Sequence, residues 1–554
     1  MMTLKKWLEK SSDFVPLRMT IRGIPGSGKS TVIKFLRRTM HQIFGQHACT
    51  LTCAPTGNAA HNVQGETIHR SWEVSRATSS KLSPTARKCL ISRMSRLVLL
   101  IVDECSLLDA QTLGSMHKNA QATVHKGRNP SESWGGIPIV LFFGDHFQLP
   151  SINPGVFESM DETLKNKILS RTKSELQKQL MQEGWQEFFN MTAHVCTLNT
   201  SHRISTTNTE LQSLMTNIRG KQDQDITDEQ AQCLLNLHLN TSGNFSSLQR
   251  QEIMNKALFL TATKESRDRH NVSMTKEEST QANCPVAICK SITTKHNMRR
   301  NNNDHHDDDR TPSLTFLVIG QRIQLNGWNI APSWGLCHGS IGKIVDVVFE
   351  KDKSPNTHDL PLYVICDFPD YKGPIFDEKH RSCVPIPSHV QHCLKGCGCQ
   401  RIHVPLFPAY AKTIHSCQGI NVGPTDEGKP DNPIQNIVAD PGTRRFESTS
   451  PGLFNTLLGR ITTLGDPLDL MTSSIHFVGP NMTEERIRWI TKKKDRSAVY
   501  QKVQLRTLWK SHLDAMELQT TQQTQSLQTM FNWWSTTEIS DKQLLHVIDF
   551  WSVN

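Results

Sequence analysis

A glycine-rich stretch near the start of the chain holds a lysine and a serine at the spacing that suits phosphate binding. It reads Gly-Ile-Pro-Gly-Ser-Gly-Lys-Ser over Gly23–Ser30 and fits the pattern G-x-x-x-x-G-K-[ST]. The glycines let backbone N–H groups turn toward phosphate oxygens, and a helix that begins directly afterwards presents its positive end to the same charge. Lys29 would contact the β and γ phosphates, and Ser30 would hold Mg²⁺. The predicted nucleotide-binding residues are Gly23, Gly26, Ser27, Gly28, Lys29, Ser30 and Thr31. A glycine-rich turn with an exposed lysine is the alternative.

Two neighbouring carboxylates follow the most apolar segment of the N-terminal half. Leu97–Val102 is apolar throughout, as expected for a strand buried on both faces, and Asp103 and Glu104 come next. Asp103 would face Mg²⁺, and Glu104 would orient or deprotonate an attacking water. Acidic pairs also cap helices, so the pair by itself says little. Its place after a phosphate-binding loop and a buried strand favours hydrolysis of a nucleoside triphosphate.

A second polar stretch follows the apolar segment Ile137–Phe143. It reads Gly-Asp-His-Phe-Gln-Leu-Pro over Gly144–Pro150. Gln148 would sense the γ-phosphate, and Asp145 would belong to the hydrogen-bond network behind it. The alternative is an ordinary connection between a strand and a turn.

The segments that carry these residues alternate between strand and helix patterns. Leu17–Arg22 alternates apolar and polar residues, which predicts a short strand, and a helix is expected from Ser30 to Phe44. Further strands are predicted over Thr50–Ala54 and His194–Leu198. Strands that alternate with helices predict a parallel α/β sheet.

The second half begins with another sheet and then changes character. Ala257–Ala262 predicts a strand, and residues 296–310 are rich in Asn and Asp, which is typical of an exposed, disordered loop. Short strands separated by Gly and Pro between residues 314 and 366 predict a small β-barrel. Signals of an α/β sheet return over residues 405–440, and after Gly479 the chain becomes charged and helical.

The composition points to a polyanionic partner and a reducing compartment. The net charge of the chain is +10, which suits nucleic acid, although a generically basic protein would have the same charge. The 15 cysteines are scattered, no apolar signal region opens the chain, and no apolar run is long enough to span a bilayer. We therefore expect an intracellular protein that does not enter a membrane, in the nucleus or alternatively the mitochondrion.

A cysteine-rich segment offers a possible metal site. Cys393, Cys397, Cys399 and His403 are four soft ligands within a short stretch, and such ligands bind Zn²⁺. Their spacing is not the usual C-x₂-C knuckle. A cysteine-rich loop without metal is therefore the favoured interpretation, and a zinc site is the alternative.

The order of the motifs resembles that of the superfamily-one DNA helicases of the petite-integration-frequency (PIF) type, which are relatives of RecD. The resemblance covers roughly residues 15–465, and the stretches at 144–150 and 413–419 are its most specific parts. The matching stretches are Gly23–Ser30, Ala54–Gly57, Gly65–His69, Asp103-Glu104, Gly144–Pro150, His202-Arg203, Thr413–Gly419 and, in weakened form, Gly459-Arg460. The chain departs from the family where Gly459 replaces the usual serine and where residues 423–452 are longer and more polar.

This resemblance implies two RecA-like P-loop domains with a small β-barrel insertion and a helical C-terminal tail. The expected boundaries are 1–205 for the first domain, 206–313 for the start of the second, 314–403 for the barrel, 404–480 for the remainder of the second domain and 481–554 for the tail.

The resemblance also assigns roles to single residues. Arg203 and Arg460 would be arginine fingers that stabilise charge on the transferring phosphoryl group. Gln418 and Gly419 would lie near the nucleotide and couple it to DNA. The DNA track would be formed by Pro55, Thr56, Thr67, His69, Thr413 and His415. For any one of these residues an ordinary cap, turn or core role is the alternative.

The implied activity is that of an ATP-dependent DNA helicase in repair, recombination or telomere maintenance. It would use ATP and Mg²⁺, act as a monomer, travel 5′-to-3′ on single-stranded DNA and open tailed duplexes. RNA stays open as a partner because backbone and stacking contacts discriminate the sugar poorly.

Two other classes of protein fit part of the sequence. A P-loop phosphotransferase needs one α/β domain, which would leave Arg203, Thr413–Gly419 and Arg460 unexplained. A nucleic-acid-binding module of helicase ancestry, with lost or weakened motor activity, would account for Gly459. DNA-stimulated ATP turnover separates the three classes.

Overall fold

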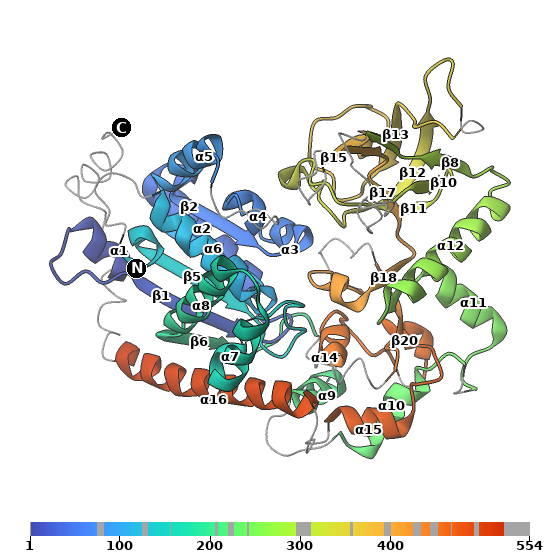
Figure 1. Ribbon diagram of the computed structural model, residues 1–554. Helices are drawn as coiled ribbons and strands as arrows, with labels where there is room; N and C mark the ends of the chain where they lie inside the picture. Colours follow the sequence, from blue (N-terminus) through green and yellow to red (C-terminus); the bar gives the residue numbers. More distant parts are fainter. Residues whose placement is uncertain are drawn as a thin grey trace. The chain divides into compact units, whose positions relative to one another are not determined.

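The chain is arranged in two compact units. The computed structural model describes residues 2–74, 82–123, 131–155, 157–204, 209–219, 226–240, 243–294, 312–354, 358–392, 400–424, 434–443, 452–466, 468–491 and 498–525. The first unit comprises Met1–Arg203, Ser448–Gly452 and Lys493–Asn554, and the second comprises Ile204–Glu447 and Leu453–Lys492. The first unit is therefore built from segments at both ends of the sequence, as the blue and red ribbons in Figure 1 show.

The first unit contains a six-stranded parallel sheet with the strand order β3-β2-β4-β5-β1-β6. The strands are β1 (Leu17–Gly23), β2 (Thr50–Ala54), β3 (Glu66–Thr67), β4 (Leu99–Val102), β5 (Ile139–Gly144) and β6 (His194–Leu198). The predicted strands are confirmed, and β2 and β6 have the predicted bounds. The two-residue strand β3 was not predicted from the sequence.

The two central strands of this sheet are apolar on both faces. Leu100 and Phe142 belong to one apolar cluster, whereas Ile101 and Phe143 belong to another. Because successive side chains of a strand point to opposite faces, one continuous apolar run supplies both clusters. This double burial explains why β4 and β5 show no alternation of apolar and polar residues.

Helices cover both faces of the first sheet. Their bounds are α1 (Met2–Leu8), α2 (Lys29–Phe44), α3 (Gly57–Asn62), α4 (Ile68–Ser71), α5 (Pro84–Met94), α6 (Ala110–Ala122), α7 (Glu162–Arg171), α8 (Glu175–Asn190) and α16 (Ala498–Gln525). Helix α2 ends at Gly45, which is left-handed and donates its N–H to the carbonyl of His41. Asp109 caps α6 by accepting the N–H of Thr112 at 2.8 Å.

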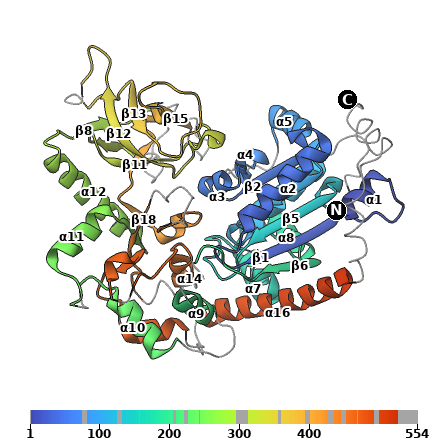
Figure 2. The ribbon, with the colours of Figure 1, turned by 180° about the vertical axis from the view of Figure 1, so that it is seen from behind.

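The long helix α16 packs into the core of the first unit. Leu505, Trp509 and Leu513 are spaced by four residues, are at most 3% exposed and share an apolar cluster with Phe142 and Phe188. In both ribbon views α16 runs beside the edge strand β6 (Figures 1 and 2). The helix expected after Gly479 is therefore present and forms part of the first α/β unit.

The second unit contains a four-stranded parallel sheet with the order β18-β7-β19-β20. Its strands are β7 (Leu258–Thr261), β18 (Ala411–Thr413), β19 (Ile437–Asp440) and β20 (Ile475–Phe477). The helices of this unit are α9 (Thr209–Ile218), α10 (Asp228–Asn236), α11 (Ser247–Lys256), α12 (Lys264–Gln281), α14 (Leu453–Leu458) and α15 (Glu484–Thr491). This sheet confirms the second α/β domain, and β20 is an addition to the prediction.

The insertion between β7 and β18 is an antiparallel β structure with its own apolar core. Its main sheet has the order β14-β13-β12-β11-β17, and two smaller sheets pair β10 with β8 and β15 with β16 and β9. The strands are β8 (Ala287–Lys290), β9 (Ile292–Thr294), β10 (Leu314–Leu317), β11 (Arg322–Leu325), β12 (Ile341–Val348), β13 (Tyr363–Asp367), β14 (Cys383–Pro387), β15 (His389–His392), β16 (Gln400–His403) and β17 (Leu406–Pro408). Among the described residues β14 and β17 stay unpaired edges of an open sheet, so the hydrogen bonds do not close the predicted barrel.

Two further sequence predictions concern loops and membranes. The loop predicted over residues 296–310 lies outside the described residues. Within the described ranges, no helix has the length and apolar character needed to cross a membrane.

Trp509→Ala tests whether α16 is part of the folded core. Trp509 is fully buried, and removing a buried tryptophan side chain costs about 3–5 kcal/mol in the free energy of unfolding. We expect a clearly lower urea midpoint for the unfolding of the first unit, measured by far-ultraviolet circular dichroism. Leu518→Ala is the matched control on the same helix, since Leu518 is 62% exposed. A Trp509→Ala midpoint equal to that of the control would contradict the docking.

Candidate functional site

The predicted motif residues of the first unit gather at one edge of its sheet. Because all six strands are parallel, their carboxyl ends lie at the same edge. The glycine-rich loop follows β1, Asp103-Glu104 follows β4, Gly144–Pro150 follows β5, and Arg203 follows β6. In open α/β sheets, ligands bind outside this edge. The fold therefore brings the predicted phosphate-binding loop and its predicted catalytic partners together.

The glycine-rich loop packs closely against the segment that contains Arg203. Gly26 has a φ of +75°, and a Cβ atom on it would lie 2.4 Å from the Cβ of Arg203. The N–H of His202 donates to the carbonyl of Gly26 at 2.8 Å. Any residue other than glycine would be strained here and would collide with Arg203. The structure thus places His202-Arg203 directly beside the loop.

Lys29 is held inside the loop, and the small residues around it complete the start of α2. Its Nζ donates to the carbonyls of Gly23 at 2.8 Å and of Ile24 at 3.1 Å. Ser27 is buried, and Ser30 and Thr31 lie in the first turn of α2. The ammonium group is therefore held by two carbonyls of the loop whose N–H groups are predicted to bind phosphate.

The acidic pair is buried behind the loop. Asp103 is 6% exposed, and its Oδ1 accepts the N–H of Glu104 at 2.9 Å. Burial, reinforced by the charge of Glu104, raises the pKa of Asp103 to about 7, and Lys29 acts in the opposite direction. The Oε2 atom of Glu104 is buried without a hydrogen-bond partner among the described residues, and the Glu104 backbone has a φ of +50°. Carboxylate oxygens such as these are the ligands that a hard divalent cation prefers, so the pair fits such an ion.

The stretch after β5 fixes a buried glutamine. Asp145 is 1% exposed, and it accepts the N–H of Phe147 at 3.1 Å and the side-chain amide of Gln148 at 3.2 Å. Gln148 is itself 1% exposed, and its Oε1 has no hydrogen-bond partner within the described ranges. The amide nitrogen of Gln148 is thus anchored, whereas its oxygen is left for another donor.

The first-unit residues of the predicted DNA track lie next to one another. Strands β2 and β3 pair in parallel with Ala54 opposite Thr67, so Pro55 and Thr56 lie beside the start of α4. The Thr56 hydroxyl accepts the N–H of Ala59 at 3.3 Å and caps α3, which gives this side chain a structural role as well. Thr67 is buried, and His69 is half-buried in α4.

In the second unit, the Thr413–Gly419 segment lies beside Arg460. The Thr413 hydroxyl donates to the hydroxyl of Ser416 at 3.2 Å, and burial lowers the pKa of His415. Burial raises the pKa of the Cys417 thiol to about 11, and the Arg460 charge opposes this shift. Gln418 is 2% exposed, and Gly419 has a φ of +88°.

Arg460 is buried almost completely. It is 3% exposed, its backbone carbonyl accepts the N–H of Val422 at 2.9 Å, and its Nε has no hydrogen-bond partner in the part of the chain that the structure describes. A buried guanidinium nitrogen without a partner is costly unless an anion or another acceptor joins it.

Lys412 is a buried charge that sequence reasoning did not single out. It is 2% exposed, and its Nζ donates to the carbonyl of Gly339 in the insertion at 3.0 Å. Burial lowers the pKa of Lys412 to about 8. The signal in the sequence is a lysine between Ala411 and Thr413 in an otherwise buried strand. This contact ties the strand before the Thr413–Gly419 segment to the β insertion.

The cysteine-rich segment is only partly described. Cys393, Cys397 and Cys399 lie outside the described residues. His403 is 1% exposed in β16, and its Nδ1 lies 3.1 Å from the backbone oxygen of Val404. No group of three or more His, Cys, Asp or Glu residues in the described ranges is arranged to hold a metal ion. The zinc alternative stays a prediction.

About a quarter of the sequence is similar to known DNA helicases. Residues 15–187 match the family model of an AAA domain. The ATP-dependent DNA helicase RRM3 of Saccharomyces cerevisiae is 31% identical over 135 residues, which are 24% of this chain and 18% of that protein. The ATP-dependent DNA helicase Pif1 of Psychrobacter sp. is 33% identical over 139 residues, which are 24% of this chain and 19% of that protein. The similarity thus spans less than a fifth of the length of either relative.

Solved structures extend the likeness to nearly the whole chain. The crystal structure of Pif1 helicase from Candida albicans has a TM-score of 0.59 at 17% identity and covers 92% of this chain and 98% of that one. Pif1 helicase from Bacteroides, in complex with ADP-AlF3 and single-stranded DNA, has a TM-score of 0.56 at 17% identity over 88% of this chain and 94% of that one. The chain, with its two parallel α/β sheets, therefore has the fold of these Pif1 helicases. In sequence it resembles the helicases RRM3 and Pif1 over about a quarter of its length.

Lys412→Met tests the buried lysine through the pH dependence of stability. The pKa of Lys412 is about 8 in the folded chain against an ordinary value of 10.5, so the unfolded chain binds more protons between these pH values. This group therefore makes the free energy of unfolding rise with pH over that interval. We expect Lys412→Met to show less of this rise than the parent in chemical unfolding between about pH 7 and pH 10. Lys256→Met is the control, since the Lys256 side chain is 72% exposed. Identical pH profiles for all three proteins would contradict the burial of a titrating lysine.

Proposed function

We propose that this protein is an ATP-dependent DNA helicase, which couples ATP hydrolysis to movement along single-stranded DNA and to duplex opening. The observation that carries the proposal is the meeting of Lys29, Asp103-Glu104 and Gln148 at one edge of a parallel sheet. A second parallel sheet carries Thr413–Gly419 beside Arg460. A phosphotransferase would need only the first of these arrangements. The similar proteins named ATP-dependent DNA helicases support the same choice.

The chemistry would take place at the γ-phosphate of ATP. The loop amides and Lys29 would bind the phosphates. Ser30 and Asp103 would hold Mg²⁺, which neutralises phosphate charge when it is bound. Glu104 would accept a proton from the attacking water through its unpartnered Oε2, and Gln148 would sense the γ-phosphate by donating a side-chain N–H to it after rotation of the amide. Buried carboxylates suit this task because a cation next to them keeps them ionised.

Two arginines would stabilise the charge that develops during hydrolysis. Arg203 lies beside the loop in the first unit, and Arg460 is buried with an unpartnered Nε in the second. Through the family resemblance, Arg460 would act on the same nucleotide. Positive charge on the transferring phosphoryl oxygens is the main electrostatic contribution that proteins make to this reaction.

DNA would bind along residues from both sheets. Pro55, Thr56, Thr67 and His69 lie together in the first unit, and Thr413 and His415 precede the Gln418-Gly419 pair in the second. The net charge of +10 favours a nucleic-acid backbone. Travel in the 5′-to-3′ direction and a role in repair or recombination belong to the proposal through the family resemblance.

Lys29→Ala tests the nucleotide site. We expect ATP turnover to fall by at least about a hundredfold, because a preorganised charge on the phosphates is lost. Binding of fluorescent single-stranded DNA should stay close to that of the parent, since Lys29 contacts the loop and the predicted DNA residues lie elsewhere. Lys118→Ala, an exposed change in α6, serves as the matched control. ATP turnover at the parent rate in Lys29→Ala would rule out the loop as the catalytic phosphate site.

Arg460→Ala tests whether the second unit takes part in hydrolysis. We expect normal ATP binding and a loss of DNA-stimulated turnover by about 10³–10⁵-fold, the usual contribution of an arginine finger. The measurement is ATP turnover with and without single-stranded DNA, together with unwinding of a tailed duplex. Arg269→Ala is the control, because the Arg269 side chain is 78% exposed. If single-stranded DNA does not stimulate ATP turnover of the parent protein, the motor function is excluded. The nucleic-acid-binding module and the phosphotransferase then remain.

A further inference from the structure

The long helix α16 reaches two of the loops that the proposed function assigns to ATP. Its apolar row, Leu505, Trp509 and Leu513, fixes the register of the helix on the first unit. The polar side chains next to the row make contacts that the anchoring of the helix does not require.

Arg506 contacts the loop that carries Gln148. Its Nη2 donates to the backbone carbonyl of Gln148 at 2.5 Å, and its guanidinium lies 5.7 Å from the ring centroid of Phe157. On another side, a Cβ atom on Gly452 would lie 2.8 Å from Nη1 of Arg506 and 2.5 Å from the carbonyl of Phe147. Arg506 is half-buried between these groups, and one of its N–H groups donates to the backbone of the proposed γ-phosphate sensor.

Trp509 supports the same loop from the next turn of the helix. Its ring lies parallel to that of His146, with centroids 6.4 Å apart and an interplanar angle of 23°. Asp145 holds the side-chain amide of Gln148 on the other side of the loop. A hydrogen bond from α16 thus holds the backbone carbonyl of Gln148, and a hydrogen bond to Asp145 holds its side-chain nitrogen.

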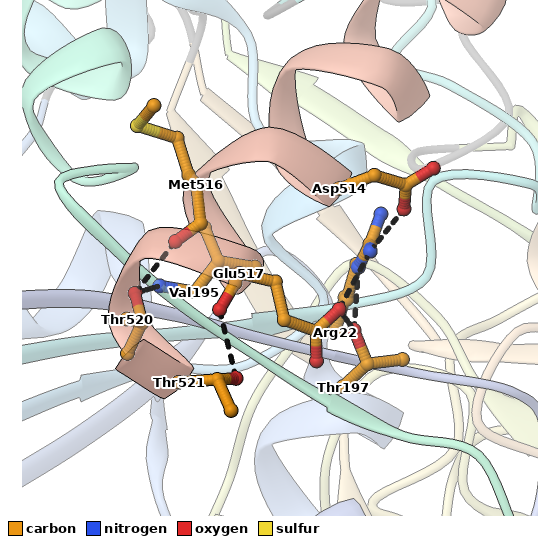
Figure 3. Close-up of polar contacts among 8 residues, drawn as sticks. All are labelled: Arg22, Val195, Thr197, Asp514, Met516, Glu517, Thr520 and Thr521. Carbon is orange, nitrogen blue, oxygen red and sulfur yellow. Dashed lines mark hydrogen bonds and ion pairs between the residues drawn. The ribbon is translucent and has the colours of Figure 1, made fainter. Parts of the chain in front are cut away.

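A second group of polar contacts reaches the strand that leads into the phosphate-binding loop. Arg22 is the residue before Gly23, and it forms ion pairs with Asp514 and, at 2.9 Å, with Glu517 (Figure 3). Its Nε also donates to the Thr197 hydroxyl at 2.7 Å, and this hydroxyl donates to Glu517 at 2.5 Å. The Arg22 side chain is 13% exposed, so these pairs are screened less than surface pairs are.

The same stretch of α16 covers the edge strand β6. The backbone N–H of Val195 donates to the Thr520 hydroxyl at 3.0 Å, and that hydroxyl donates to the carbonyl of Met516 at 2.8 Å (Figure 3). An edge strand otherwise presents unpaired backbone groups. The helix therefore pairs one backbone N–H of the edge strand β6, which lies next to β1, the strand that contains Arg22.

We propose that α16 is a positioning element of the nucleotide site. Arg506 is a positioning residue for Gln148, and Asp514 with Glu517 positions Arg22 at the start of the phosphate-binding loop. This inference rests on the proposed function, because that function assigns Gln148 and the loop to ATP. Helix α16, although far from the phosphate-binding loop in the sequence, would then help to determine the geometry of the nucleotide site.

Arg506→Ala in the full chain tests the proposal. We expect the kcat of DNA-stimulated ATP hydrolysis to fall about ten- to hundredfold, with little change in the KM for ATP, because a misplaced catalytic group costs turnover more than binding. Arg506→Lys should recover most of the loss, since an ammonium group can still donate to the Gln148 carbonyl. Ser511→Ala, an exposed change on the same helix, should behave as the parent.

Amide hydrogen exchange gives a readout that does not need activity. Exchange at residues 144–150 should be faster in Arg506→Ala than in Ser511→Ala, while exchange over 509–520 and the melting temperature stay unchanged. If kcat and loop exchange both equal those of Ser511→Ala, the proposal is overturned. It is equally overturned if exchange rises along the whole helix with a lower melting temperature, since Arg506 would then be an anchor only. If the parent protein shows no ATP turnover, the proposed function is wrong. The comparison of amide exchange would still decide whether Arg506 positions the loop.

Discussion

The burial of both faces of one parallel sheet is the constraint on which the rest of the first unit depends. Strands β4 and β5 are apolar on both sides, so each must lie in the middle of the sheet with a layer of helices on either face. Parallel strands then place their carboxyl ends at a single edge. Charged and polar side chains can collect only where these strands end, which is why Asp103, Glu104 and Gln148 lie together although many residues separate them in the sequence.

At that edge the protein keeps groups that are expensive to bury. Asp103 has a raised pKa, Glu104 has a left-handed backbone and a carboxylate oxygen without a partner, and the oxygen of Gln148 is free of hydrogen bonds within the described residues. Buried polar atoms normally find partners, and strained backbone tends to occur at functional sites. Burial of the apolar side chains on both faces of the sheet stabilises the fold and offsets the unfavourable free energy of burying these polar groups.

Local patterns in the sequence predicted the strands of the two α/β sheets, except β3 and β20, and the loops at their ends. The bounds of β2 and β6 could be predicted because each is a short β-prone run between polar turns. The insertion was harder, since its strands pair antiparallel across long connections and its closure depends on pairing that no single segment specifies. Lys412 was missed because a lysine in a strand ordinarily marks an exposed face, and only the tertiary structure shows that it is buried.

The position of α16 could not be predicted for a related reason. A row of apolar residues such as Leu505 and Trp509 shows that one face of a helix is buried, but it does not show against what. Arg22 and Asp514 are 492 positions apart, and no periodicity in the sequence connects them. The Gly452 contact with Arg506 is likewise visible only once the chain has folded.

The first unit is therefore assembled from both ends of the chain, and this affects how the protein is made. When the ribosome has released residues 1–204, β6 still has an open edge, and the apolar cluster around Phe142 and Phe188 lacks Trp509 and Leu513. That surface stays uncovered while the second unit is synthesised, at a usual rate of about 5–20 residues per second. For this interval the edge strand β6 of the nascent first unit has backbone groups that could pair with another strand. The order of synthesis thus places completion of the first unit after that of the second.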